Sequence, residues 1–216
     1  MEYGEGMSFA MQGSLLDLDD DLTIHPVAEG LTRRVLGAGA WVDLRPGWLT
    51  GGDALFDVLH REVPWRAERR QMYDNIVDVP RLTKFYDAGE TLPHPMLDTA
   101  REMLSDHYTG ELGERFVTAG LCLYRDGRDS VAWHGDRIGR STTEDTMVAI
   151  LSVGSPRPLM LRPRDGGGAS LRLPLGHGDL VVMGGSCQRT WDHAIPKTSE
   201  PVGPRISVQF RVAGVR

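Results

Sequence analysis

Cysteine is scarce in this chain of 216 residues, which has only Cys122 and Cys187. Two cysteines in apolar, strand-like contexts do not make a disulfide framework, so a reducing compartment is expected. The sequence also has no apolar run of about 18 or more residues, which argues against a membrane span. Residues 1–6 lack the basic start and apolar stretch of a secretory signal. We therefore expect a cytoplasmic protein with no membrane partner.

An excess of basic charge is also missing. The chain has 24 Lys and Arg against 30 Asp and Glu, a net charge of -6. Proteins that bind duplex nucleic acid tightly usually show a basic footprint, so this balance argues mildly against them, although a local basic patch stays compatible with it. The hydrophobic content of 40% and the length fit one globular domain, which we expect to be a monomer.

The chain divides into a leader, a mixed segment and a strand-rich segment. Residues 1–24 are predicted to be a loose leader and residues 25–216 a single domain. Within residues 25–115 the apolar spacing predicts a helix that Asp53 could cap and a second helix from about Pro95. These helices and a substrate lid in the same segment would support the strands that follow.

Short strands separated by Gly and Pro predict a jelly roll in residues 116–216. An earlier strand is predicted at 36–44, before the Arg45-Pro46-Gly47 turn. The predicted strands of the core are 116–124, 131–134, 146–153, 158–162, 169–174, 179–183, 190–195 and 205–212. The fold class is therefore α+β, a double-stranded β-helix with N-terminal helices packed against it.

His134-Gly135-Asp136 is a candidate metal-binding motif, because alternate residues of a strand share a face. His193, from a later strand, would complete a set of two imidazoles and one carboxylate, which is typical of non-haem Fe(II) oxygenases. A second motif, His177-Gly178-Asp179, has no basic strand at the right distance behind another ligand. It is better explained as a turn before the strand at 180–183. A half-exposed strand histidine and a loop histidine are the simpler explanations of His134 and His193.

The strand at 205–212 alternates in a way that suggests an anion pocket. Arg205, Ser207, Gln209 and Arg211 face one side, and the apolar residues between them face the other. A guanidinium offers a planar fork of donors that suits a small carboxylate. A metal triad with such an arginine predicts Fe(II) and a dicarboxylate cosubstrate, which makes the simpler explanations of the histidines the weaker ones.

Aromatic and basic residues gather between Trp65 and Tyr86. Nucleobases stack on aromatic rings and phosphates pair with arginine, so this segment could face a nucleotide. The candidate substrate residues are Tyr73, Arg81, Phe85 and Tyr86. A strand and loop edge with mixed surface charge explains the same residues at least as well.

Several further motifs resemble the AlkB family of Fe(II)/2-oxoglutarate dioxygenases, from about residue 35 to residue 213. They include Val63-Pro64-Trp65, Val79-Pro80-Arg81, Leu123-Tyr124-Arg125-Asp126-Gly127, Met183-Gly184-Gly185, Trp191-Asp192-His193 and Pro204-Arg205-Ile206-Ser207. The resemblance implies that Fe(II), 2-oxoglutarate and O2 are used, with His134, Asp136 and His193 as iron ligands. It also implies that Arg205 and Tyr124 bind 2-oxoglutarate, that Ser207 and Arg211 line the same pocket, and that His177 is structural.

Two departures from the family concern cosubstrate and substrate. Cys122 stands where the family has a cosubstrate-binding asparagine, and Arg137-Ile138-Gly139 replace acidic residues that follow the metal motif in repair enzymes. The function that the resemblance implies is oxidative dealkylation of N-alkylated bases, with single-stranded or alkylated nucleic acid as partner. A dioxygenase of a small molecule or a protein side chain is the alternative, and a non-catalytic jelly-roll binding protein is disfavoured.

Overall fold

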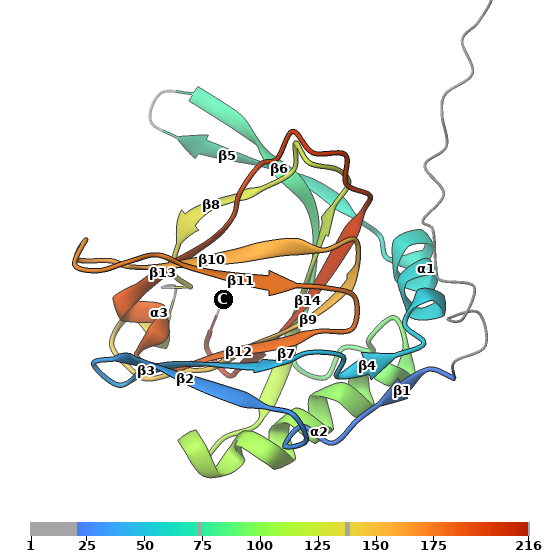
Figure 1. The fold of residues 1–216 in the computed structure, drawn as a ribbon. Helices are drawn as coiled ribbons and strands as arrows, with labels where there is room; N and C mark the ends of the chain where they lie inside the picture. Colours follow the sequence, from blue (N-terminus) through green and yellow to red (C-terminus); the bar gives the residue numbers. More distant parts are fainter. Residues whose placement is uncertain (1–20, 73–74, 137–138, 216) are drawn as a thin grey trace, which may run out of the picture.

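Antiparallel strands dominate the computed structural model, which describes residues 21–72, 75–136 and 139–215 (Figure 1). One sheet contains β2 (Thr32–Gly37), β3 (Ala40–Arg45), β5 (Arg66–Met72), β6 (Asn75–Tyr86), β7 (Phe116–Tyr124), β9 (Val148–Gly154), β12 (Leu180–Gly185) and β14 (Arg205–Val212). A smaller sheet contains β8 (Val131–His134), β10 (Arg157–Pro163), β11 (Leu171–Leu175) and β13 (Trp191–Ile195). The short strands β1 (Thr23–Ile24) and β4 (Leu49–Thr50) pair with each other.

The order of the strands is that of a jelly roll. The larger sheet runs β2-β3-β12-β9-β14-β7-β6-β5 and the smaller one runs β11-β10-β13-β8. Several pairs join strands far apart in sequence, as β14 pairs with both β7 and β9. The eight strands predicted after residue 115 are all present, three of them with the predicted bounds. The predicted fold class is therefore confirmed.

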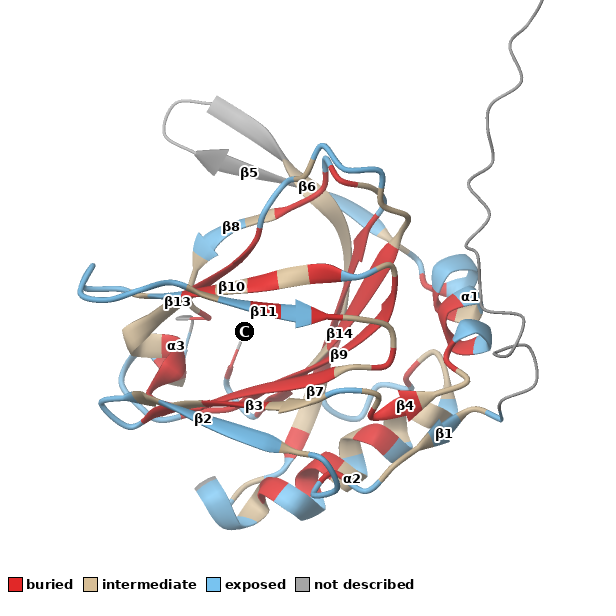
Figure 2. Ribbon diagram, in the orientation of Figure 1, coloured by how far each residue is buried: buried red, intermediate tan, exposed pale blue. Residues whose placement is uncertain are grey.

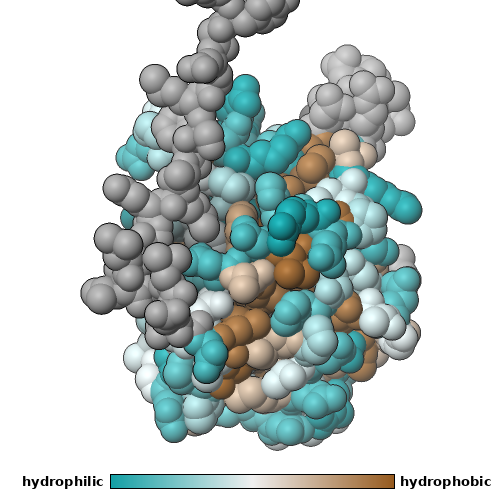
Figure 3. All heavy atoms as spheres, turned by 90° about the vertical axis from the view of Figure 1, so that its right-hand side faces the viewer, coloured by the Kyte–Doolittle hydropathy of each residue, from teal (hydrophilic) through white to brown (hydrophobic). Residues whose placement is uncertain are grey.

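The helices lie on the larger sheet. α1 (Asp53–Glu62) contacts β9 and β14, and α2 (Pro95–Leu112) contacts β7, while α3 (Cys187–Thr190) and the 3-10 turn η1 (Arg140–Thr142) are short. β9 and β12 are buried along their whole length, and β14 at every position but Gln209, because one face meets the helices or neighbouring loops and the other the interior (Figure 2). Figure 3 shows the α1 side, where apolar residues run through the middle of a largely hydrophilic face. Among the described residues, no helix combines the length and apolar character needed to cross a membrane.

The start of α1 differs from the prediction by one residue. Gly52 is the N-cap and makes no side-chain cap bond, and Asp53 is the first helical residue, where its charge faces the positive helix end. A Cβ on Gly52 would lie 2.5 Å from His177 Nε2 and 2.6 Å from Leu49 Cδ2. The close approach of His177 therefore requires glycine at the cap.

Residues 36–44 were predicted as one strand, and this prediction was wrong. The chain instead turns at Gly37-Ala38-Gly39, whose φ angles are 93°, 50° and 83°, and β2 pairs with β3. Two glycines allow the positive φ angles of this turn.

The predicted leader and substrate lid are described in part. Thr23–Ile24, placed in the leader, forms β1, and residues 1–20 lie outside the described residues. The lid segment forms the β5–β6 hairpin, which extends the larger sheet at its edge. The backbone of this segment therefore agrees with the alternative explanation, a strand and loop at the edge of a sheet.

Candidate active site

The cavity between the two sheets has a volume of about 270 Å³ and is floored by β14. Arg205, Ser207, Gln209 and Arg211 all line it, as the alternation along this strand predicted. The residues between them, Ile206, Val208 and Phe210, are fully buried on the other face. Because β14 pairs on both sides, with β7 and β9, the positions of its polar side chains are fixed by the sheet.

His134, Asp136 and His193 meet at one end of this cavity. Their possible ligand atoms all lie within 4.8 Å of one another, and they form the one such group found among the described residues. The pairing of β13 with β8 places His193 directly opposite His134, with ring centroids 4.3 Å apart. The side chain of His134 is 38% exposed and that of Asp136 is 9% exposed, so the group opens to solvent on the His134 side.

The ring of His134 is oriented by backbone carbonyls. Its Nδ1 lies 2.9 Å from the carbonyl oxygen of Ala132 and 3.2 Å from that of His193. A carbonyl only accepts, so Nδ1 donates its proton to these oxygens. Nε2 lies 3.6 Å from Asp136 Oδ1, on the side that all three groups share. This orientation leaves Nε2 as the nitrogen that can bind a metal.

Asp136 is held by Arg211, a contact that the sequence did not predict. Nε and Nη2 of Arg211 donate to Asp136 Oδ2 at 3.0 and 2.8 Å, and the Asp136 N–H donates to Gln188 Oε1 at 3.0 Å. Burial alone would raise the pKa of Asp136, but Arg211, His193 and His134 outweigh it and lower this pKa to about 2. The carboxylate is therefore ionised at neutral pH, with Oδ1 left toward His134.

His193 is held in its neutral form. Burial, followed by repulsion from His134, lowers the pKa of His193 to about 3. A neutral imidazole beside an ionised carboxylate is the protonation state in which such side chains bind a metal ion. The three groups could thus hold a divalent cation on one face.

At the other end of the cavity, Arg205 is buried with an unused donor. Its Nε donates to Ser152 Oγ at 2.7 Å, while its Nη1 is buried and has no hydrogen-bond partner. Burial lowers the pKa of Arg205 and raises that of Tyr124, which faces it across the strands, to about 12. A buried cation with a free donor beside a protonated phenol could bind a carboxylate.

Cys122 and Gln209 occupy the floor between these two ends. Gln209 Nε2 lies 3.4 Å from Cys122 Sγ and donates to Ser207 Oγ at 3.1 Å, and Gln209 Oε1 accepts from Arg211 at 2.6 Å. Gln209 was not chosen as a site residue, although its alternate position in the strand was the available signal. An amide is therefore present here even though residue 122 is cysteine.

The structure describes three of the four predicted substrate residues and places them on different faces of β6. Arg81 lines the cavity and Phe85 lies on the same face of β6, opposite Gly120 of β7. Tyr86 does not belong to the cavity: the alternation of β6 turns it to the other face, where it is buried in the hydrophobic core. Tyr73 lies outside the described residues.

Gly120 leaves the room that Arg211 occupies. A Cβ at this position would lie 2.8 Å from Arg211 Nη1 and 3.6 Å from the ring of Phe85. Any side chain here would therefore press on the arginine that holds Asp136.

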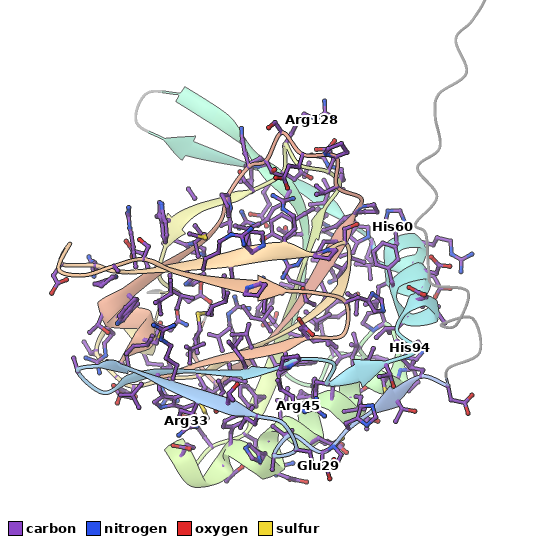
Figure 4. All side chains as sticks on the ribbon, in the orientation of Figure 1. Glu29, Arg33, Arg45, His60, His94 and Arg128 are labelled. Carbon is purple, nitrogen blue, oxygen red and sulfur yellow. The ribbon has the colours of Figure 1, made fainter. Side chains whose placement is uncertain are left out.

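Other histidines stay away from the cavity. His177 Nδ1 accepts from the Gly154 N–H at 2.9 Å, in the turn before β12, which agrees with its predicted structural role. Figure 4 shows that His60 and His94 lie at the periphery, on the helix side of the barrel. Asp192, the residue before His193, faces outward, and its Oδ2 lies 3.6 Å from Arg162 Nη2.

The sequence matches the model of the 2OG-Fe(II) oxygenase superfamily over residues 54–211. That match covers more than half of the chain and includes every cavity residue named above. The chain therefore belongs to the 2OG-Fe(II) oxygenase superfamily, whose members are oxidoreductases that use Fe(II), 2-oxoglutarate and O2.

Its relatives place it among the AlkB-like members of that superfamily. It is 31% identical to alpha-ketoglutarate-dependent dioxygenase alkB homolog 3 of Bos taurus, over 97% of this chain and 76% of the relative. It is 30% identical to DNA oxidative demethylase ALKBH2 of Homo sapiens, over 74% of this chain and 67% of the relative. Among solved structures, a prolyl-4-hydroxylase of Pseudomonas putida aligns with a TM-score of 0.54 at 17% identity, over 85% of this chain and 91% of that one. That likeness concerns the fold alone.

The residues present fit the metal and the cosubstrate of this family. Two imidazoles and one carboxylate on a single face are the usual donor set for non-haem Fe(II) and leave further coordination positions open. The unused Nη1 of Arg205, at the far end of the cavity, suits the distal carboxylate of a dicarboxylic acid.

Proposed function

We propose that the chain is an oxidative dealkylase of N-alkylated nucleobases in single-stranded DNA or RNA. Its iron ligands would be His134, Asp136 and His193. The observation that carries this proposal is the presence, in one cavity, of a triad of two imidazoles and a carboxylate and of a buried arginine whose Nη1 has no hydrogen-bond partner. The similarity to alkB homolog 3 and ALKBH2 supports nucleic acid as the substrate class.

The cosubstrate would lie along β14. Arg205 and Tyr124 would bind the distal carboxylate, and Ser207, with Gln209 beside it, would line the middle of the pocket. Arg211 would act through Asp136, which it keeps ionised and fixed in orientation. Gln209 would supply the amide that residue 122 does not.

The target base would enter on the His134 side. Arg81 lines the cavity, and Phe85 offers an aromatic ring on the same face of β6. An enzyme that acts on a base usually takes it out of the stack and holds it by stacking in a closed pocket. We assign base recognition to Arg81 and Phe85, and not to Tyr86.

Bound Fe(II) with 2-oxoglutarate and O2 supplies an oxidant that hydroxylates a C–H bond, and a hydroxylated N-methyl group then leaves as formaldehyde. The chain's own residues orient these partners and exclude water. Leu159, Ile195 and Val148 form the apolar walls of the cavity, which protects a reactive centre from side reactions. We further propose that a monomer acts in a reducing compartment, the cytoplasm, since both cysteines are buried free thiols.

The test is formaldehyde release from two panels of substrates. One contains single-stranded oligonucleotides with different N-methylated bases, and the other contains small N- and O-methylated compounds and methylated peptides. Release from the first panel that is lost in Asp136→Ala and retained in His177→Ala supports the proposal. Release confined to the second panel would overturn the choice of nucleic acid and leave the oxygenase chemistry in place.

A further inference from the structure

The outer face of the smaller sheet is open to solvent. β8, β10 and β11 carry exposed or half-buried residues at their outward positions, whereas the central strands of the larger sheet are buried on both faces (Figure 2). The pairing aligns Arg172, Met160 and the buried Ala194 across three of these strands. Trp133 lies on the neighbouring strand, β8.

On this face the guanidinium group of Arg162 lies over the ring of Trp133. Trp133 is one of two large hydrophobic residues found exposed in the described chain, at 36%. The guanidinium carbon of Arg162 lies 4.4 Å from the centre of its ring, and Asp192 Oδ2 lies 3.6 Å from Arg162 Nη2. The carboxylate and the ring together restrain a planar cation whose side chain is still 44% exposed.

The position of Trp133 connects this face with the cavity. β8 is the edge strand of its sheet, and its pairing with β13 is irregular between the His193 and Ile195 positions. The extra residue lets Val131 and His134 both line the cavity. Trp133 directly precedes His134, which lies on the side where the triad opens, and its own side chain belongs to the outer face.

We propose that Trp133 and Arg162 form a stacking platform for a nucleotide that flanks the target base in a single strand. This inference rests on the proposed function and adds the surface that holds the rest of the strand. A guanidinium plane and an aromatic ring are the two surfaces on which unpaired bases stack. The outward positions of these four strands carry Arg162 and Arg172 against a single Asp192, so the face is positive on a chain of net charge -6. That local sign suits a phosphate backbone.

The experiment compares a methylated mononucleotide with oligonucleotides of increasing length that carry the same base. Both direct binding by fluorescence anisotropy and formaldehyde release are measured on the Fe(II)-loaded protein. In Arg162→Ala the gain in affinity from mononucleotide to oligonucleotide should fall by about fivefold or more, the effect of losing one stacked base. Trp133→Phe should keep most of the gain and Trp133→Ala should lose it. Arg115→Ala is the matched control, because Arg115 is an exposed arginine paired with Asp106 on the α2 side.

The outcomes separate the two proposals. An unchanged length dependence in Arg162→Ala and Trp133→Ala, in a protein that still demethylates oligonucleotides, would overturn the platform and leave the proposed function intact. An equal loss on mononucleotide and oligonucleotide would also overturn it, since the residues would then act on the cavity. A wild-type protein that neither binds nor demethylates any oligonucleotide would refute the proposed function and the platform together. Arg162→Lys is a further test. Lysine keeps the positive charge but lacks the planar guanidinium group, so the stacking proposal predicts a loss of affinity close to that of Arg162→Ala.

Discussion

Replacing Arg211 with methionine should damage both the stability and the metal affinity of the protein. The substitution keeps an unbranched apolar stem but removes both hydrogen bonds to Asp136 Oδ2, in a pair whose side chains are each 9% exposed. Breaking a buried ion pair by removing one partner costs roughly 3 to 5 kcal/mol, because the other charge stays buried. For a chain of this length the melting temperature of the metal-free protein should then fall by roughly 6 to 20 °C.

The pH dependence of stability follows from the same contact. The pKa of Asp136 in the folded, metal-free protein, about 2, lies below the unfolded value. A lowered pKa contributes stability that is complete above the unfolded pKa, about 3.9, and is lost as pH falls through the folded one. The wild type should therefore lose about 2 kcal/mol from this group between roughly pH 4 and pH 2. In Arg211→Met the pKa should rise, so the corresponding loss begins at higher pH.

The assay is thermal and urea unfolding of metal-free protein across this pH range, with Mn(II) binding measured alongside by calorimetry. Arg115→Ala, which removes an exposed pair, should change the free energy of unfolding by at most about 1 kcal/mol. Wild-type stability and Mn(II) affinity in Arg211→Met would refute the view that Arg211 acts through Asp136. A normal Mn(II) affinity with a raised requirement for 2-oxoglutarate would instead place its role in direct cosubstrate binding.

Four further substitutions test the other parts of the site. Asp136→Ala should abolish Mn(II) binding and turnover, whereas His177→Ala should lower only stability, and calorimetry that shows the reverse would exchange the two motifs. Arg205→Lys loses the bidentate fork and should raise the KM for 2-oxoglutarate tenfold or more, roughly the cost of one charged hydrogen bond; an unchanged KM would exclude the carboxylate role. Phe85→Ala should lower demethylation of an oligonucleotide more than uncoupled 2-oxoglutarate decarboxylation, and equal losses would remove Phe85 from base recognition.

The alternation of residues along a strand predicted which face each side chain occupies, but it did not predict which residues of other elements that side chain contacts. The period of two along β14 assigned Arg205, Ser207 and Arg211 to one face, because alternation depends only on the strand itself. The partner of Arg211 depends on how β14 lies relative to the end of β8, which belongs to the other sheet. The spacing of residues in the sequence does not reveal this arrangement. The Arg211–Asp136 contact was therefore missed, although both residues had been chosen.

The choice of substrate residues also depended on non-local pairing. Phe85 and Tyr86 were chosen together because both are aromatic, but neighbours on a strand point to opposite faces, and only the pairing of β6 with β7 decides which faces the cavity. In β8 the irregular pairing interrupts the alternation, so the outward position of Trp133 could not be read from spacing either. The hairpin at Gly37-Ala38-Gly39 was missed for a local reason, since two glycines one residue apart were themselves a turn signal.

The arrangement of central and edge strands gives this enzyme an uneven tolerance to mutation. Arg205 and Arg211 sit on β14, which is buried and paired along both sides, so substitutions there disturb two neighbouring strands at once. Trp133 on β8, the edge of the smaller sheet, and Arg81 and Phe85 on β6, next to the edge strand β5, lie away from this doubly paired strand. Selection can therefore change which molecule is presented to the metal while the oxidation chemistry stays constant. Variation among descendants of this chain should concentrate on β5, β6 and β8 long before it reaches β14.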